Sequence, residues 1–340
     1  MNSSTVKEKI ILAITQDMKI YECFVDNLKF LNFEVFLICN IGKDLKYKNF
    51  YDRLHNLFRK TILKDKSFKK KLFKKYELKN NLNYLKLIPN CDYSLTIRAD
   101  LFNDKVLKAI VEKSSKNYSY QWDGLSRFPD IYKSLNLFNK FYVFDKKDLN
   151  YENKTYPINN FYFDCYTLLF ANKKPEFDVY YIGSYDARIN KLIQICEHLK
   201  SKNLKLNIII CGKPKIDLSS YSYIKIVHDP LNYYENLKMV ANCKILIDLH
   251  HENLHKGLSF RTFEALGYEK KLITSNRIVS EYDFYNKNNI HIIEDDKMNL
   301  DDFLNTNYQE VNQEIKAKYS FTNWIKYVLE KDNSIPLFIH

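Results

Sequence analysis

The chain has 340 residues, which is too long for one ordinary hydrophobic core and fits two domains of about 150 residues each. Apolar residues make up 46% of the chain and charged residues 28%, which excludes a largely disordered protein. The formal net charge is +12, and no apolar run approaches the roughly 20 residues that a membrane-spanning helix needs. We therefore expect a soluble, packed globular protein.

Strand and helix patterns alternate through the first half of the chain. Strands are predicted at 10–14, 34–39, 93–97, 118–122 and 141–144, with a helix at 21–31. This alternation predicts a parallel sheet covered by helices on both faces. The stretch 151–174 is rich in Asn and aromatic residues and loses the rhythm, so we place the crossing between two domains there.

The second half restarts with a clearer alternation of the same kind. Strands are predicted at 179–182, 206–211, 223–227, 244–249, 271–274 and 290–293, and helices at 187–200, 233–241 and 259–266. The fold class is therefore α/β, with two Rossmann-like domains facing a central cleft. The predicted domains are 1–155 and 176–312, and the segment 313–340 carries a helix that either domain could hold, including by packing back on the first.

A strongly basic segment lies within the first domain. Between Lys43 and Lys79 there are 14 Lys or Arg and 4 acids, with apolar residues from Phe50 to Tyr76 at approximate helical spacing. We interpret 43–80 as a helical insert, which is either a solvated surface or a patch for an anionic membrane or a negatively charged acceptor. Nucleic acid is also compatible with charge alone, but no nucleic-acid-binding module accompanies the segment, so it is not the expected partner.

Cysteine usage and the amino terminus indicate the compartment. The 7 Cys form no Cys-x-x-Cys pair, which favours reduced core thiols over disulfides or a zinc site. The first apolar run lacks a small-residue cleavage site, so no signal peptide is predicted. We expect a cytoplasmic protein, peripheral at the inner face of the plasma membrane if the basic insert binds lipid.

The most informative stretch runs from Lys244 to Asn276. A strand ends in polar residues and a turn containing Gly257, and a helix then begins near Ser259 with Arg261 in its first turn. Backbone N–H groups at such a helix start, helped by a hydroxyl and a guanidinium, form a binding site for a diphosphate. Glu264, one turn further, can accept both ribose hydroxyls of the same nucleotide, or it is merely a helix-face acid before a Gly turn.

At these residues the sequence resembles the GT-B glycosyltransferases of the group 1 class, and more closely the CgeB-like and lipopolysaccharide or capsule transferases of bacteria. The resemblance rests on FEALGYEKKLITSN (263–276), on VYYIGSY (179–185) and on NYSYQWD (117–123). In that class two glutamates lie about two helical turns apart and the second binds the ribose, which Glu264 matches. The first position is Lys256 here, so retention of anomeric configuration does not carry over.

The resemblance implies a nucleotide-sugar donor as substrate, no cofactor and no metal. Similar proteins use cations near the cleft to neutralise the leaving diphosphate, a role that fits Arg188 and Lys213, although each cation taken alone is more often a surface residue. The expected donor site comprises Gly183, Ser184, Arg188, Lys213, Lys256, Gly257, Ser259, Arg261 and Glu264. A metal site at His250, His251 and His255 is the alternative to polar loop residues, and Glu294, Asp295 and Asp296 are interpreted as a solvated turn.

Two carboxylates follow strands of the first domain. Asp17 and Asp123 should lie at the carboxyl edge of the sheet, where either could act as general base toward an acceptor hydroxyl, or could simply cap a helix and a turn. We expect transfer of a sugar to a glycan or lipid-linked glycan of the bacterial surface. The alternatives are a non-catalytic nucleotide-sugar-binding protein and a basic membrane- or RNA-binding module. The donor sugar, linkage, stereochemical outcome and oligomeric state do not follow from the sequence.

Overall fold

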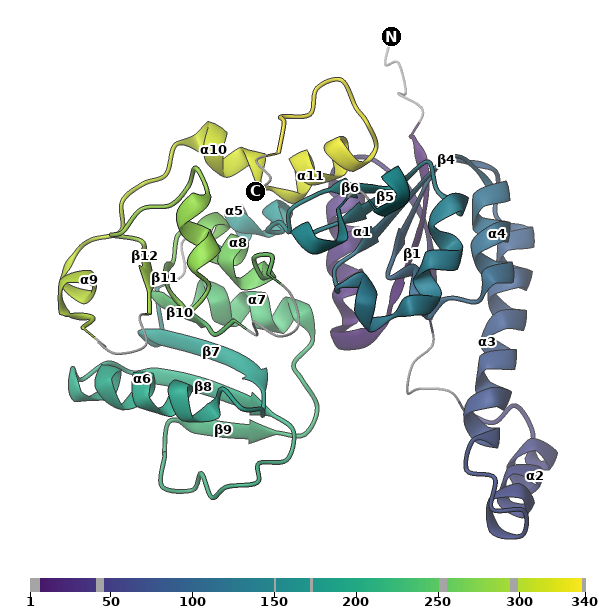
Figure 1. The fold of residues 1–340 in the computed structure, drawn as a ribbon, viewed down its shortest axis with the longest axis horizontal. Helices are drawn as coiled ribbons and strands as arrows, with labels where there is room; N and C mark the ends of the chain where they lie inside the picture. The colour runs from purple at the N-terminus through teal and green to yellow at the C-terminus, as the bar shows by residue number, and fades with distance from the viewer. Residues whose placement is uncertain are drawn as a thin grey trace.

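The computed structural model describes residues 7–40, 46–149, 151–171, 174–250, 256–293 and 299–337. Within these residues the chain forms two six-stranded sheets, and every strand pair in both is parallel. Figure 1 shows the two sheets side by side with helices around each. The predicted α/β architecture of two Rossmann-like halves is confirmed.

The first sheet has the strand order β2-β1-β3-β4-β5-β6. Its strands are β1 (Lys9–Thr15), β2 (Glu34–Asn40), β3 (Cys91–Ile97), β4 (Ser114–Gln121), β5 (Lys140–Val143) and β6 (Thr155–Pro157). Alternate residues of β1 face opposite sides, since Ile10 and Leu12 belong to one buried cluster and Ile11 and Ala13 to another. Helix α1 (Ile20–Phe30) covers the first side and α4 (Asp104–Glu112) the second.

The second sheet has the order β12-β11-β10-β7-β8-β9. Its strands are β7 (Val179–Ser184), β8 (Leu206–Cys211), β9 (Ile224–Val227), β10 (Ile245–Asp248), β11 (Lys271–Thr274) and β12 (Ile290–Ile292). Helix α6 (Ile189–Ser201) packs on one face, and α7 (Tyr233–Ala241) and α8 (Phe260–Gly267) pack on the other. The face that carries α7 and α8 is continuous with the core of the first domain.

An aromatic cluster joins the two halves. Phe24 of α1 packs edge-on against Phe161 and Phe163 from the segment between the sheets. Trp324 of α11 (Phe321–Val328) lies 4.5 Å from Phe161 between ring centroids and donates its indole N–H to the Asn159 carbonyl. The chain therefore returns to the first domain after completing the second sheet. Outside the basic insert, the other α-helices of the described residues are α5 (Thr167–Phe170), α9 (Asp301–Asn305) and α10 (Gln313–Lys318).

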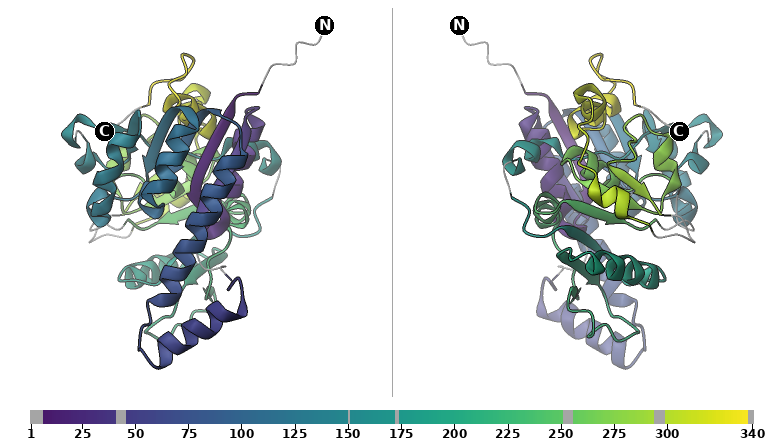
Figure 2. Two further views of the ribbon diagram at one scale, coloured as in Figure 1. Left: turned by 90° about the vertical axis from the view of Figure 1, so that its right-hand side faces the viewer. Right: turned by 90° about the vertical axis from the view of Figure 1, so that its left-hand side faces the viewer.

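The described part of the basic insert folds as a helical hairpin of α2 (Phe50–Thr61) and α3 (Phe68–Leu87). Asn49 caps α2 by accepting the Asp52 backbone N–H, and the Tyr76 hydroxyl of α3 donates to the Asp52 carboxylate. Figures 1 and 2 show the hairpin projecting from the first domain, with α2 at its far end. No helix in the described ranges is both long enough and apolar enough to cross a membrane.

Candidate functional site

Two adjoining cavities lie at the carboxyl ends of the two sheets, the edge at which open parallel sheets bind ligands. The C-terminal pocket, of about 580 Å³, is lined by the ends of β7, β8 and β10 and by the start of α8. The interdomain pocket, of about 390 Å³, is lined by residues at or just beyond the ends of β1, β3, β4 and β5 and by the start of α8. The residues that line both pockets are Met18, Tyr233, Ser259 and Phe260.

Glu264 lies in the wall of the C-terminal pocket on α8. The residue is 2% exposed, and its Oε1 accepts a hydrogen bond of 2.5 Å from the Tyr233 hydroxyl. Its Oε2 lies 3.3 Å from Arg261 Nε, which is an ion-pair distance without hydrogen-bond alignment. Within the described residues, Glu264 Oε2 and Arg261 Nε are both buried atoms without a hydrogen-bond partner. The two atoms neutralise each other's charge, but their hydrogen-bonding capacity is unused, which is compatible with a polar ligand at this wall.

Burial controls the protonation of this cluster. Desolvation raises the pKa of Glu264, and the Arg261 charge and the Tyr233 hydroxyl act in the opposite direction without cancelling it. Desolvation followed by the Glu264 charge holds the pKa of Tyr233 well above its usual value, so its hydroxyl remains a proton donor. A ligand hydroxyl that donated to Oε2 would stabilise the ionised carboxylate.

The predicted helix start is present, but its hydroxyl is already engaged. Ser259 is the N-cap of α8, and its Oγ accepts the Arg261 backbone N–H at 3.1 Å. The same hydroxyl donates to Asp248 Oδ2 at 2.8 Å, at the end of β10. Ser259 therefore holds the helix start in place, and the Asp248 carboxylate stands beside it in the pocket wall.

Gly183 and Ser184 also lie where the sequence places them. Both line the C-terminal pocket at the end of β7. A Cβ atom on Gly183 would lie 2.3 Å from the Tyr181 hydroxyl oxygen, so the close approach of that side chain requires glycine. The Tyr181 hydroxyl therefore occupies the space that a side chain at position 183 would fill.

The two predicted cations occupy different positions. Arg188 lines the C-terminal pocket, pairs with the Asp186 carboxylate and donates to the Leu249 carbonyl. Lys213 is exposed and, within the described residues, is not part of the lining, although its neighbour Gly212 is. The geometry thus supports a role in the pocket for Arg188 and leaves Lys213 outside the wall.

Lys256 and Gly257 contact the first domain. The Lys256 backbone N–H donates to Asp145 Oδ2 at 3.1 Å. A Cβ atom on Gly257 would lie 2.5 Å from the Phe144 ring and 2.7 Å from the Phe144 carbonyl oxygen. The turn before α8 therefore ties the two domains together, and neither residue is among the described residues that line the C-terminal pocket.

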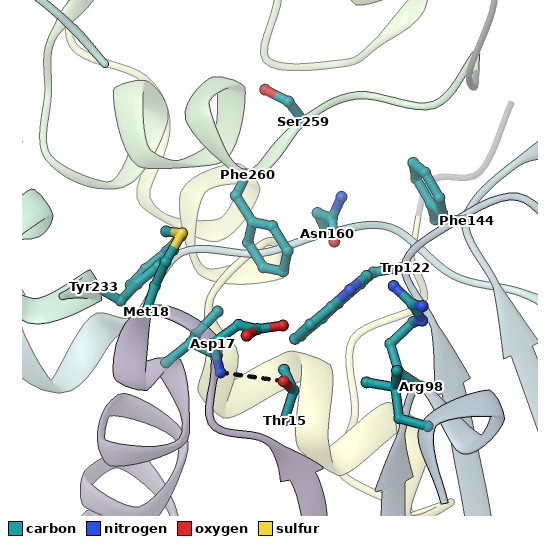
Figure 3. A pocket seen from close by; sticks show the side chains of 12 residues that line it. Thr15, Asp17, Met18, Arg98, Trp122, Phe144, Asn160, Tyr233, Ser259 and Phe260 are labelled. Carbon is teal, nitrogen blue, oxygen red and sulfur yellow. Dashed lines mark hydrogen bonds between the residues drawn. The ribbon is translucent and has the colours of Figure 1, made fainter. Parts of the chain in front are cut away.

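The two candidate bases differ sharply in environment. Asp17 lines the interdomain pocket, and Figure 3 shows its carboxylate pointing toward Trp122. Asp123 is ion-paired with both Arg98 and Arg127, and it is not among the described lining residues of that pocket. The helix cap of α1 is Lys19, so Asp17 does not cap that helix. The geometry favours Asp17 over Asp123 as the base.

Of the three histidines of the alternative metal site, the structure describes only His250. The His250 backbone N–H donates to Ser275 Oγ, and its Nδ1 lies 3.3 Å from Asn276 Nδ2. His251, His255 and the acids 294–296 lie outside the described residues. Among the residues that are described, no group of three or more His, Cys, Asp or Glu side chains could hold a metal ion.

Several lining residues escaped the sequence reasoning. The local sequence predicts only a helix at Tyr233 and a strand end at Asp248. Asp248 ends a strand at the carboxyl edge of a parallel sheet, so the argument made for Asp17 applies equally to it. Phe260 and Trp122 form the aromatic wall of the interdomain pocket, with ring centroids 6.0 Å apart. Their contact joins segments 138 positions apart, so no local pattern could reveal it.

Comparison of the sequence with protein-family models and with curated proteins finds no match. Solved structures show remote similarity, and three of them illustrate its extent. A glycosyltransferase from Rickettsia africae ESF-5 is 14% identical with a TM-score of 0.43, covering 86% of this chain and 85% of that one. The UDP-GlcNAc 2-epimerase of Methanocaldococcus jannaschii is 13% identical with a TM-score of 0.46, covering 96% and 94%. An alpha1,3-fucosyltransferase with GDP is 11% identical with a TM-score of 0.34, covering 99% and 87%. Likenesses this remote indicate neither an activity nor the role of any residue in this chain.

Proposed function

We propose that the chain is a glycosyltransferase that binds a nucleotide-activated sugar in the C-terminal pocket and transfers the sugar to an acceptor hydroxyl in the interdomain pocket. The observation that carries this proposal is the buried ion pair of Glu264 Oε2 and Arg261 Nε, neither of which has a hydrogen-bond partner among the described residues, in the wall of a pocket at a helix start. Its volume of about 580 Å³ lies within the usual range for small-molecule and cofactor sites.

The donor is proposed to place its ribose on Glu264, where a ribose hydroxyl would donate to the unpartnered Oε2. The Asp248 carboxylate already accepts from Ser259 and Thr262 at the start of α8 and would repel a diphosphate brought against it. We therefore place the diphosphate beside Gly183 and Ser184 at the end of β7, in the same pocket as Arg188. Arg188 would neutralise its charge there without a metal ion.

The acceptor is proposed to lie in the interdomain pocket, beside the aromatic rings of Trp122 and Phe260. Asp17 would remove the proton of the attacking hydroxyl as its oxygen bonds to the anomeric carbon and the nucleoside diphosphate leaves. Tyr233, Ser259 and Phe260 line both pockets, so a donor and an acceptor bound there would meet at one wall.

We further propose that the acceptor is a bacterial surface glycan, part of a lipopolysaccharide, lipooligosaccharide or capsule, met at an anionic membrane. Helix α2 exposes a row of large apolar side chains, at Phe50 (70% exposed), Leu54 (52%), Leu57 (55%) and Phe58 (49%). Between Lys43 and Lys79 the segment that contains α2 and α3 carries 14 Lys or Arg against 4 acids. An exposed apolar stripe bordered by cations fits a surface of anionic lipid headgroups.

A thermal-shift screen tests the nucleotide site directly. UDP, GDP, CDP and their sugar conjugates would be added to the intact chain, and a ligand at a hundred times its dissociation constant should stabilise it by about 2.7 kcal/mol. Turnover of the selected sugar nucleotide would then be measured with mixed glycan acceptors. Stabilisation without turnover would favour a non-catalytic nucleotide-sugar-binding protein, and the absence of any nucleotide-dependent shift would refute the proposal.

A further inference from the structure

A third cavity, of about 890 Å³, lies on the first domain between α3 and the loops at the carboxyl edge of the sheet. One wall is a single face of α3, and the other is formed by Asn40 at the end of β2, by the segment Asp100–Asp104 and by residues near 130. The cations that line it are Lys66, Lys69, Lys70, Lys74 and Lys133, and we call this cavity the lysine groove.

Three of these cations have no ion-pair partner among the described residues. Lys133 pairs with Asp130, and Lys69 lies over the Phe73 ring at 5.4 Å. Within the described residues, no ion-pair partner is found for Lys66, Lys70 or Lys74. The other acids of the groove are Glu77, Asp100 and Asp104, of which Asp100 is held by the Arg98 guanidinium. On the α3 wall of the groove, Lys69, Lys70 and Lys74 therefore outnumber the single acid, Glu77.

Asn81 adds an independent indication of a ligand. It lies on the same face of α3, lines the groove and is 7% exposed. Its side-chain Nδ2 is a buried donor without a hydrogen-bond partner among the described residues. A buried amide donor beside several cations matches an oxygen-rich anion, because each oxygen could accept from the amide or a lysine.

The lysine groove adjoins the interdomain pocket. Leu101 lines both cavities. Arg98 lines the interdomain pocket and donates two hydrogen bonds of 2.7 Å to Asp100, which lines the groove. The two cavities therefore lie on either side of one short segment after β3, and a ligand of several sugar units could cross it.

We propose that the lysine groove binds an anionic group, a carboxylate or a phosphate, carried by the acceptor glycan whose reacting hydroxyl lies in the interdomain pocket. The inference rests on the proposed function, because it assigns the interdomain pocket to the acceptor. It specifies the acceptor class as acidic glycans. The cations of one face of α3 act on the acceptor, in contrast to the apolar row of α2, which is proposed to meet lipid.

The test compares two variants of equal charge loss. Lys70→Gln/Lys74→Gln removes two cations of the groove, and Lys71→Gln/Lys75→Gln removes two exposed cations of α3 that are not among the described lining residues. Binding of three probes is measured at constant ionic strength: a sialylated oligosaccharide, a phosphorylated hexose and an uncharged oligosaccharide. The parent should bind one anionic probe more tightly than the uncharged one, and the groove variant should lose about fivefold to thirtyfold of that affinity.

The remaining outcomes separate the sources of the anion and the causes of a failure. Tighter binding of the sialylated probe identifies a carboxylate, and tighter binding of the phosphorylated probe identifies a phosphate. Equal loss in both lysine variants, or no preference of the parent for either anionic probe, would overturn the proposal. Asn81→Asp, checked for an unchanged melting temperature, should also weaken binding of the anionic probe. Nucleotide binding is measured in the parent and in the same variants as a separate test of the proposed function. A parent that binds no nucleotide would refute the proposed function, whatever the result with the anionic probes.

Discussion

The ring of Phe260 packs edge-on against the indole of Trp122, at an interplanar angle of 83°. Phe260 is the first residue of α8, which carries Arg261 in the same turn and Glu264 one turn further, whereas Trp122 directly follows β4 of the first domain. Helix α8 therefore lines both the C-terminal pocket and the interdomain pocket. A substitution meant to affect only one of the two pockets must leave this contact intact.

Arg261→Ala and Glu264→Gln should each weaken nucleotide binding by about 1.5–3 kcal/mol, because each removes one charged group of the buried Arg261–Glu264 ion pair. Calorimetric titration with the nucleotide selected in the screen would measure the loss. Lys215→Ala, at an exposed position outside the described pocket lining, is the control and should bind as the parent does. Unchanged affinity in both pocket variants would exclude Glu264 and Arg261 as ligands of the nucleotide.

Asp17→Asn should lower kcat by about 10²–10⁴-fold while leaving nucleotide affinity unchanged, because it removes only the proposed base. Asp123→Asn should act mainly on the fold, since it breaks the ion pairs with Arg98 and Arg127. Its melting temperature should fall, with a smaller loss of kcat. Steady-state kinetics and thermal melts of both variants distinguish the roles, and a larger rate loss in Asp123→Asn would transfer the base to that residue.

Activity should persist in excess chelator, because phosphate neutralisation is assigned to Arg188. The measurement is turnover before and after incubation with EDTA, followed by addition of Mg²⁺, Mn²⁺ or Zn²⁺. A complete loss that one of these ions restores would show that a metal takes part in the reaction.

The stability of the ligand-free chain should depend on pH through Glu264. Burial raises the pKa of this carboxyl above its ordinary value of 4.5, so the folded state binds the proton more tightly than the unfolded chain. The stability that the folded state gains from this bound proton is complete below about pH 4.5 and is lost as the pH rises through the raised folded-state pKa. Glu264→Gln cannot ionise, so its melting temperature relative to the parent should rise across that window and then level off. A difference that is flat or falls with pH would contradict the raised pKa.

The α2 apolar row should be required for membrane contact. Phe50→Ser, Leu54→Ser and Phe58→Ser together remove three exposed apolar side chains, and cosedimentation with anionic vesicles should weaken by about tenfold or more. Turnover on a short water-soluble acceptor should remain. Binding of the parent should fall with added salt and be weak on neutral vesicles. If the parent does not sediment with anionic vesicles, or the variant sediments equally well, the row is a solvated surface.

The strands and most core helices could be predicted because their patterns are local. The helix at 233–241 and the strand at 271–274 match α7 and β11 to the residue, since each is a short run bounded by turn-forming residues. Strand β6 (Thr155–Pro157) was missed because three residues ending in proline carry no period, and only pairing with β5 makes them a strand.

The candidate site was predictable in composition but not in partners. The spacing from Ser259 to Glu264 marks a helix start followed by an acid, and the structure shows both. Nothing local reveals that Asp123 is bound by two arginines, because Arg98 comes from the end of another strand. Likewise, the pairing of Tyr233 with Glu264 depends on the packing of α7 against α8.

The return of the chain through α11 limits how the cleft can open. The first domain is connected to the second before β7 and again after β12, and Trp324 and Phe161 lie in the aromatic cluster between these two crossings. A single connection would let the domains swivel, whereas two connections that flank one buried aromatic cluster restrict their relative motion. We expect the cleft to open by bending about Phe161 and Trp324, so that the pocket mouths separate while the aromatic cluster remains packed.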